Sequence, residues 1–188
     1  KTETAKALAQ TYFGSEERML RLDMSEFQDA EGPKRLIGDP NTQTPGRLAS
    51  MVRENPFSLL LLDEFEKANP AILNLFLQIL DEGFLTDAFG KRVSFNNVII
   101  IATSNAGAEF IREAIEKKAP LTSRDLVNYV LENGLFSPEL INRFDGVVVY
   151  LPLTPEEVVK ITELMLKQLA AKLKESKNIS MEIKLFIR

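Results

Sequence analysis

The sequence predicts an α/β fold in which a parallel sheet is flanked by helices, and two observations support this prediction. The first is the stretch 58–63, where four consecutive leucines precede the acids Asp63 and Glu64. Such a run is typical of a strand buried on both faces, as in a parallel sheet covered by helices. The second is the presence of two further apolar runs, at residues 98–102 and 147–150, which predict two more buried strands.

Local signals predict the elements of the first third of the chain. Residues 1–10 are rich in helix formers, and Gly14 can end this helix. Residues 19–24 alternate apolar and charged side chains, which indicates a strand. Residues 25–46 are polar and rich in proline and glycine, which predicts a loop with a short turn of helix. A short helix is predicted over residues 47–54.

The helix that follows the leucine strand has clear boundaries. Asn69 can cap it, Pro70 suits its first turn, and Gly83 suits its end. A hairpin is predicted over residues 84–95, and further helices near residues 108–118, near residues 123–133 and from Ser137 onward. A capping-box pattern at residues 154–157 predicts the start of a last helix, and residues 180–188 alternate as a strand would.

The composition is that of an ordinary globular protein and excludes several kinds of chemistry. Of 188 residues, 45% are hydrophobic and 27% are charged, with a net charge of −4. The absence of cysteine and histidine excludes disulfides, thiol nucleophiles, zinc sites built from these residues and histidine general bases. Without a long basic run, a general affinity for nucleic acid or for anionic membrane is not indicated. The lack of a membrane-span pattern or signal peptide favours a cytoplasmic location.

The chain is expected to be a piece of a longer protein that includes parts of two domains. It opens without an initiator methionine, in a stretch that already predicts helix. An approximate domain boundary is expected at Leu153, which separates residues 1–152 from residues 153–188.

An acid pair follows the leucine strand at its predicted carboxyl end. Open α/β sheets bind their ligands at this end of the strands. Asp63 would be placed there to hold a magnesium ion, which prefers oxygen ligands, and Glu64 could orient or deprotonate an attacking water. The alternative is a buried strand that runs into an ordinary acidic loop.

Other candidate site residues are weak signals when each is taken alone. Lys1 and Thr2 match the end of the phosphate-binding pattern G-x-x-x-x-G-K-[ST], without its glycines, or are ordinary surface residues. Asn105 follows the strand at residues 98–102 and can reach the same crevice as Glu64, or it only starts a turn. Arg143 is expected to point away from the apolar face of its helix, either toward a partner or into solvent.

Several motifs, in their order along the chain, together resemble the Clp-type AAA+ unfoldases, in particular the second ATPase module of ClpA, ClpB and ClpC. The motifs occupy residues 24–27, 35–38, 62–68, 85–87, 103–105 and 137–145. The resemblance covers essentially the whole chain, which makes it more specific than any single motif. It implies a P-loop AAA+ sheet flanked by helices in residues 1–152, lacking its first strand and phosphate loop. It also implies that residues 153–188 begin a small α-rich lid domain.

The resemblance implies ATP and Mg²⁺ as cofactors. By position, Lys1 and Thr2 correspond to the end of the Walker A motif, so Lys1, Thr2 and Asp63 would bind the nucleotide, with Thr2 and Asp63 at the metal. Asp63 and Glu64 correspond to the Walker B acid and the catalytic glutamate that polarises water. Because the phosphate-loop glycines are absent, the resemblance leaves open whether this segment alone binds nucleotide or hydrolyses it.

The same resemblance implies a ring in which neighbouring subunits share a site. Asn105 corresponds to sensor 1, which helps to position the water, and Arg143 corresponds to the arginine finger that reaches a neighbour's nucleotide. The implied partners are unfolded or aggregated protein chains, identical subunits in a homo-hexamer of the full-length protein and, as an open expectation, a peptidase. Neither a membrane nor a nucleic acid is implied.

One segment departs from the family pattern and keeps other functions open. After Gly38, where the family carries an aromatic pore loop, residues 39–47 are polar, shorter and without an aromatic. This weakens the expectation that the protein threads polypeptide and suits an AAA+ switch that remodels an assembly without threading. A nucleic-acid motor and a structural domain without turnover are the remaining alternatives.

Overall fold

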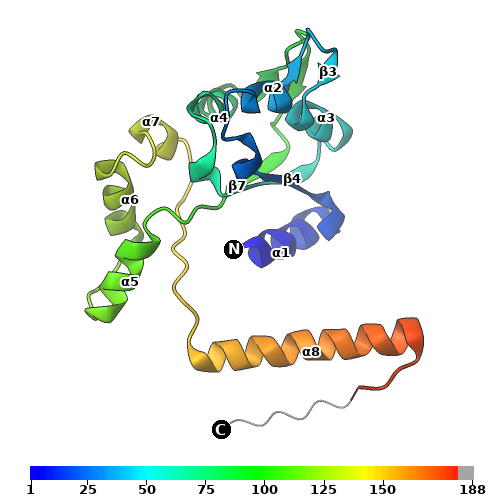
Figure 1. Ribbon diagram of the computed structural model, residues 1–188, viewed down its shortest axis with the longest axis vertical. Coiled ribbons are helices and arrows are strands. Elements are labelled where there is room, and N and C mark those ends of the chain that lie inside the picture. The colour runs from blue at the N-terminus through cyan, green and yellow to red at the C-terminus, as the bar shows by residue number, and fades with distance from the viewer. Residues whose placement is uncertain (182–188) are drawn as a thin grey trace. The chain divides into compact units, whose positions relative to one another are not determined.

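Three parallel strands form the central sheet, in the order β1–β4–β7. The strands are β1 (Met19–Asp23), β4 (Ser58–Asp63) and β7 (Val98–Ala102). The computed structural model describes residues 1–181. Helices of the part that contains the sheet lie on both of its faces (Figure 1). Because β4 pairs in parallel with both neighbours, the carboxyl ends of the strands share one edge. The predicted α/β fold with a parallel sheet flanked by helices is confirmed.

Strand β4 is buried on both faces, as its leucine run predicted. Leu60 and Leu62 belong to the larger core, while Leu59 and Leu61 pack in a second cluster with two alanines of helix α1. All four leucines are 0% exposed. Alternate side chains of a strand point to opposite faces, so an unbroken apolar run is what a doubly covered strand requires.

Most of the helices begin and end where local signals placed them. They are α1 (Thr2–Phe13), α2 (Gly32–Ile37), α3 (Arg47–Glu54), α4 (Pro70–Glu82), α5 (Ala108–Glu116), α6 (Ser123–Glu132), α7 (Pro138–Ile141) and α8 (Pro155–Lys177). Short 3-10 turns η1 (Glu16–Arg18), η2 (Met24–Phe27) and η3 (Phe65–Lys67) connect some of them. Asn69 caps α4 and a left-handed Gly83 ends it. Helix α1 lies on one face of the sheet, with α2, α3 and α4 on the other (Figure 1).

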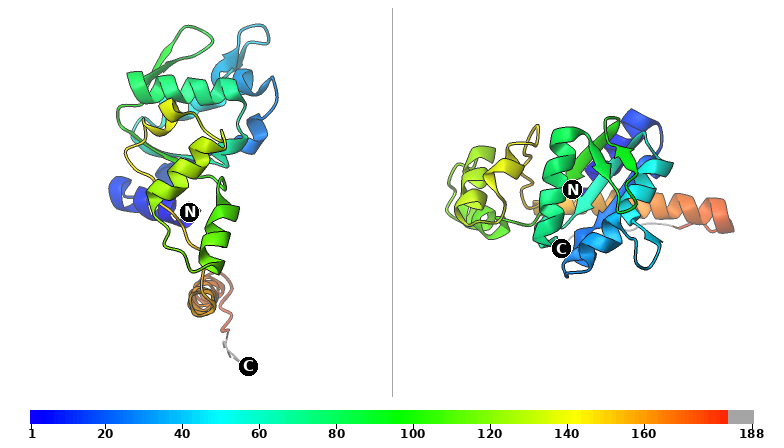
Figure 2. Two further views of the ribbon diagram at one scale, coloured as in Figure 1. Left: turned by 90° about the vertical axis from the view of Figure 1, so that its left-hand side faces the viewer. Right: turned by 90° about the horizontal axis from the view of Figure 1, so that it is seen from above.

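Two small hairpins lie side by side (Figure 2). One pairs β2 (Gly38–Asp39) with β3 (Thr44–Pro45), and the other pairs β5 (Phe84–Thr86) with β6 (Arg92–Ser94). The backbone nitrogen of Ala88 donates to the carbonyl oxygen of Ile37 at 3.1 Å and joins the two hairpins. The loop predicted over residues 25–46 therefore contains more regular structure than its polar composition indicated, namely η2, α2 and the first hairpin.

The third predicted apolar strand, residues 147–150, is not a strand. Val148 is 76% exposed, and the Tyr150 hydroxyl donates to Thr4 Oγ1 at 2.8 Å. A strand needs a ladder partner, and β7 pairs only with β4 among the described residues. The apolar, β-branched composition of this run is typical of a strand, but composition could not show whether a neighbouring strand would be within reach.

The chain divides into two compact units, with the boundary between residues 150 and 151. The second unit contains α8, which begins at a complete capping box between Thr154 and Glu157. The alternating run at residues 180–188 lies, apart from its first two residues, outside the described part of the chain. Within residues 1–181, no helix is both long enough and apolar enough to cross a membrane.

Candidate active site

The carboxyl ends of β4 and β7 and the start of α1 bring polar side chains together at one edge of the sheet. Asp63, the last residue of β4, accepts a hydrogen bond from Thr103 Oγ1 at 2.5 Å and one from Arg21 Nη2 at 2.6 Å. Its side chain is 16% exposed. Burial would raise the pKa of Asp63, but these two donors outweigh it and hold the pKa below its usual value. Asp63 is therefore an ionised carboxylate near neutral pH.

The lowered pKa of Asp63 predicts a pH-dependent contribution to stability. A carboxyl whose pKa falls on folding stabilises the protein above its unfolded pKa, about 3.9, and this contribution is lost as the pH falls through the folded value. The difference in free energy of unfolding between wild type and Asp63→Asn should shrink as the pH falls below about 4. Urea unfolding at stepped pH measures this difference. Arg21→Ala should weaken the pH dependence, and a difference independent of pH would contradict the assignment.

Glu64 marks a sharp change in chain direction directly after β4. Its backbone is left-handed, with φ 54° and ψ 46°, a conformation that non-glycine residues seldom adopt and that is enriched at functional sites. Its side chain is 32% exposed and pairs with Lys67 at 2.7 Å. The turn lets Phe65 enter the core, where it is 1% exposed and stacks on Phe136.

Lys1 and Asn105, which are 104 positions apart in sequence, are in direct contact. Lys1 Nζ donates to Asn105 Oδ1 at 2.9 Å and also to the carbonyl oxygen of Ser104. Thr2 is the first residue of α1, so it lies at the same helix start. The structure thus groups Lys1, Asp63, Glu64 and Asn105 around the ends of β4 and β7.

Arg143 stands apart from this group. It follows α7, its side chain is 50% exposed, and its Nε lies 2.7 Å from Asp81 Oδ1 of α4. The sequence predicted an exposed side chain but not this partner. The ion pair engages Nε of the guanidinium.

Several site neighbours were not identified from the sequence. They are Arg21, Thr103, Glu66 and Lys67, which contact Asp63, Asn105 or Glu64. Thr103 carried a usable signal, because it directly follows the apolar run of β7, as Asn105 does two residues later. Arg21 carried a weaker one, since the parallel register places β1 beside β4.

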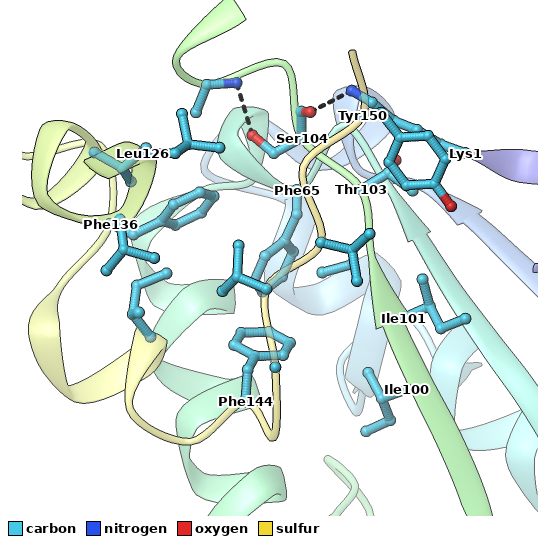
Figure 3. A pocket seen from close by; sticks show the side chains of 18 of the residues that line it. Lys1, Phe65, Ile100, Ile101, Thr103, Ser104, Leu126, Phe136, Phe144 and Tyr150 are labelled. Carbon is cyan, nitrogen blue, oxygen red and sulfur yellow. Dashed lines mark hydrogen bonds between the residues drawn. The ribbon is translucent and has the colours of Figure 1, made fainter. Parts of the chain in front are cut away.

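Beside β7 lies a largely apolar cavity of about 430 Å³, shown in Figure 3. Ile100 and Ile101 of β7 and the later residues Val147 and Val148 are among the residues that line it. Lys1 lies at its rim, where Figure 3 shows its bond to Ser104. The cavity is therefore lined both by β7 and by residues 147–150, which the sequence predicted to be a further strand.

Comparisons with known proteins place this geometry in a family. Residues 1–147 match the model described as AAA domain (Cdc48 subfamily). The chain belongs to this AAA family. It is 43% identical over 190 residues to the chaperone protein ClpB of Prochlorococcus marinus. It is 44% identical over 172 residues to the Clp protease ATP-binding subunit ClpE of Lactococcus lactis. These alignments cover 97% and 89% of the AAA chain, but only 22% and 23% of the two relatives.

Solved structures agree with this assignment. A closed-state cryo-EM reconstruction of Hsp104 with ATPγS and FITC casein matches with a TM-score of 0.80 and 32% identity, covering 94% of the AAA chain and 31% of the Hsp104 chain. The Hsp104–ADP complex of S. cerevisiae matches with a TM-score of 0.78 and 33% identity, covering 92% and 30%. The AAA chain is therefore of the Clp type and spans about a fifth of the length of its ClpB and ClpE relatives. Membership of this family implies nucleotide binding and ATPase activity in general.

Proposed function

We propose that the chain is the ATP-hydrolysing module of a Clp-like protein unfoldase or disaggregase that works as a ring. One observation carries this proposal. Lys1, Asp63, Glu64 and Asn105 lie around one sheet edge in a chain that belongs to the AAA family. The names of its ClpB relatives, and casein in the Hsp104 reconstruction, favour protein chains as the substrate.

The residues at this edge have complementary roles in the proposed reaction. The Lys1 ammonium exchanges its contacts with Ser104 and Asn105 for the phosphate oxygens of ATP. Glu64 leaves Lys67 and polarises the attacking water, and Asn105 helps to hold that water in line with the terminal phosphate. Phosphoryl transfer depends mainly on such positioning and on charge neutralisation, and little on covalent chemistry of the protein.

The side chains at this edge suit a magnesium ion that is bound together with the nucleotide. No cluster of three or more acidic, histidine or cysteine side chains that could hold a metal occurs within residues 1–181. Magnesium commonly uses one or two protein ligands, with phosphates and waters supplying the rest. Ionised Asp63 and the Thr2 hydroxyl are the proposed ligands. The hydrogen bond from Arg21 to Asp63 Oδ2 must then break. The ion would neutralise phosphate charge.

Arg143 is proposed to serve the nucleotide of an adjacent subunit in a homo-hexamer. Its half-exposed guanidinium is anchored by Asp81 on its own chain and contacts none of the other proposed site residues. An arginine supplied from a neighbour would make hydrolysis depend on ring assembly, as arginine fingers do in other ATPases and GTPases.

Residues 1–152 are proposed to form the large ATPase subdomain without its first strand, and residues 153–188 the beginning of the small one. The cavity beside β7 supports the first part, because β7 on one side and residues 147–150 on the other have no further strand partner among the described residues. An apolar strand placed there would hydrogen-bond to the open backbone edge of β7.

A second candidate function is an ATP-driven switch that remodels assemblies without threading polypeptide. The β2–β3 hairpin favours it, because residues 38–45 contain no aromatic side chain. Phe89 of the neighbouring hairpin, which is 38% exposed, lies against Gly38. Within the two hairpins, Phe89 is the exposed aromatic side chain that would supply a bulky grip on a translocating chain.

The test is an ATPase assay on the full-length protein, with and without an unfolded protein such as casein. We expect turnover that rises when unfolded protein is added, and release of a stably folded, tagged reporter into an unfolded state. Turnover without unfolding of the reporter would support the switch. Stimulation only by DNA or RNA would favour a nucleic-acid motor, and no turnover would contradict the ATPase proposal.

A further inference from the structure

The hydrogen-bond ladder between β4 and β7 continues beyond the two strands and ends on a side chain. Thr103 N donates to the carbonyl oxygen of Leu62 at 2.8 Å, and Phe65 N donates to the carbonyl oxygen of Thr103 at 2.9 Å. The next nitrogen on this side of the β7 segment, two residues on, is that of Asn105. It donates at 3.0 Å to Glu66 Oε1 and not to a backbone carbonyl.

The left-handed turn at Glu64 explains why Asn105 N donates to a side chain and not to a backbone carbonyl. In a regular parallel ladder, alternate residues of one strand bond to backbone groups of the next. With φ 54° at Glu64, the chain after β4 turns into η3, so the backbone no longer runs beside residue 105. The Glu66 carboxylate supplies the acceptor that the backbone would otherwise have provided. The backbone of Asn105 is thus fixed to the same segment that carries Asp63 and Glu64.

Taken alone, the buried carboxylate of Glu66 lowers the stability of the fold. Its Oε2 is buried and has no hydrogen-bond partner among the described residues. Burial of an unpaired carboxylate oxygen costs free energy, and glutamine or an apolar side chain would reduce that cost. The contribution of Glu66 must therefore come from what Oε1 holds, which is the backbone of Asn105.

We propose that Glu66 is a positioning residue that keeps Asn105 in place for the proposed ATP hydrolysis, and this inference rests on that function. The Asn105 side chain is held by Lys1 in this structure. When Lys1 turns to the phosphates, the Asn105 amide loses that partner. The bond from Asn105 N to Glu66 then remains to hold Asn105 at the end of β7 beside Glu64.

The first test measures the tether itself and needs no catalytic activity. Hydrogen–deuterium exchange on the full-length protein should show faster exchange in a peptide covering residues 103–108 for Glu66→Ala. Glu66→Asp should also show faster exchange in this peptide, because the shorter aspartate side chain cannot reach Asn105 N. Glu66→Gln keeps an acceptor of the same length and should exchange as wild type does. The exposed Glu54 of α3 provides the control Glu54→Ala. Unchanged exchange in both Glu66→Ala and Glu66→Asp would overturn the inference.

The second test is a double-mutant cycle on ATP hydrolysis. Glu66→Ala should lower kcat by about 10- to 100-fold with KM for ATP nearly unchanged, since small misplacements of a positioned group cost rate. In an Asn105→Ala background, the same change should have little further effect, because residues that act as a unit are non-additive. Glu66→Gln should restore most of kcat.

The outcomes separate this inference from the proposed function. If Asn105→Ala and Glu64→Gln each lower kcat, but Glu66→Ala still lowers kcat by its full factor in the Asn105→Ala background, only the inference about Glu66 fails. If Asn105→Ala leaves kcat unchanged, the proposed role of Asn105 fails, and the role of Glu66 fails with it. If Glu66→Gln is as impaired as Glu66→Ala while its exchange is normal, the hydrogen bond is not what matters and the inference is overturned.

Discussion

Replacement of Arg143 by alanine is expected to slow ATP hydrolysis by the full-length ring by about 10³- to 10⁵-fold, the range known for arginine fingers. The physical reason is the loss of a positive charge that stabilises the phosphates only in the transition state. Steady-state ATPase kinetics measure the loss, and thermal unfolding checks that the variant folds. The matched control is Arg112→Ala, since Arg112 is also exposed and pairs with Glu109 at 3.2 Å. An exposed ion pair contributes little, so this variant should hydrolyse ATP at nearly the wild-type rate.

Mixed rings test whether Arg143 acts on a neighbouring subunit. Subunits with Glu64→Gln keep an intact Arg143, and subunits with Arg143→Ala keep an intact Glu64. If Arg143 acts in trans, rings assembled from both variants should regain activity at those interfaces where the two intact side chains meet. No recovery in mixed rings would contradict action in trans. A loss below about 10-fold for Arg143→Ala would leave only the ion pair with Asp81 as its role.

Replacement of Glu64 by glutamine is expected to lower the rate of ATP hydrolysis by about 10²- to 10⁴-fold, the usual contribution of a general base or water-orienting group. ATP binding should persist, because Lys1, Thr2 and Asp63 are unchanged. The variant should therefore stall with ATP bound and retain its protein client. Single-turnover hydrolysis, nucleotide titration and co-purification of labelled casein measure these three properties.

The control for this prediction is Glu113→Gln, which removes an exposed carboxylate that pairs with Lys117 at 2.9 Å. It should not change hydrolysis, since Glu113 lies on α5 and takes no part in the proposed site. If Glu64→Gln hydrolysed ATP at the wild-type rate, Glu64 would not be the catalytic carboxylate. Its left-handed backbone would then serve only to direct Phe65 into the core.

Much of the fold was predictable because its signals are local. The boundaries of α4 follow from Asn69 as a cap, Pro70 in the first turn and Gly83 in the left-handed position at the end. The burial of β4 on both faces follows from its leucines alone. The failure at residues 147–150 has the opposite origin. An apolar β-branched run specifies a strand only when a partner is present, and a partner is a non-local property.

The candidate site was predictable in outline for the same reason. Asp63 and Asn105 each follow an apolar strand, and parallel strands end at one edge, so sequence order was enough to bring them together. The partners of these residues were not predictable. Arg21 and Glu66 reach Asp63 and Asn105 only because β1 lies beside β4 and the chain turns at Glu64.

The sequence by itself determined the strands β4 and β7, the capped helix α4 between them, the candidate residues of the active site and the resemblance to a Clp-type AAA+ module. Only the tertiary structure decided that Lys1 contacts Asn105, that Asp81 anchors Arg143 and that Glu66 holds the backbone of Asn105. Helix capping, hydrophobic periodicity and burial can be predicted because they depend on residues that are close together in the sequence. A hydrogen bond between residues far apart in sequence depends instead on strand order, and on backbone turns that no single stretch of sequence specifies.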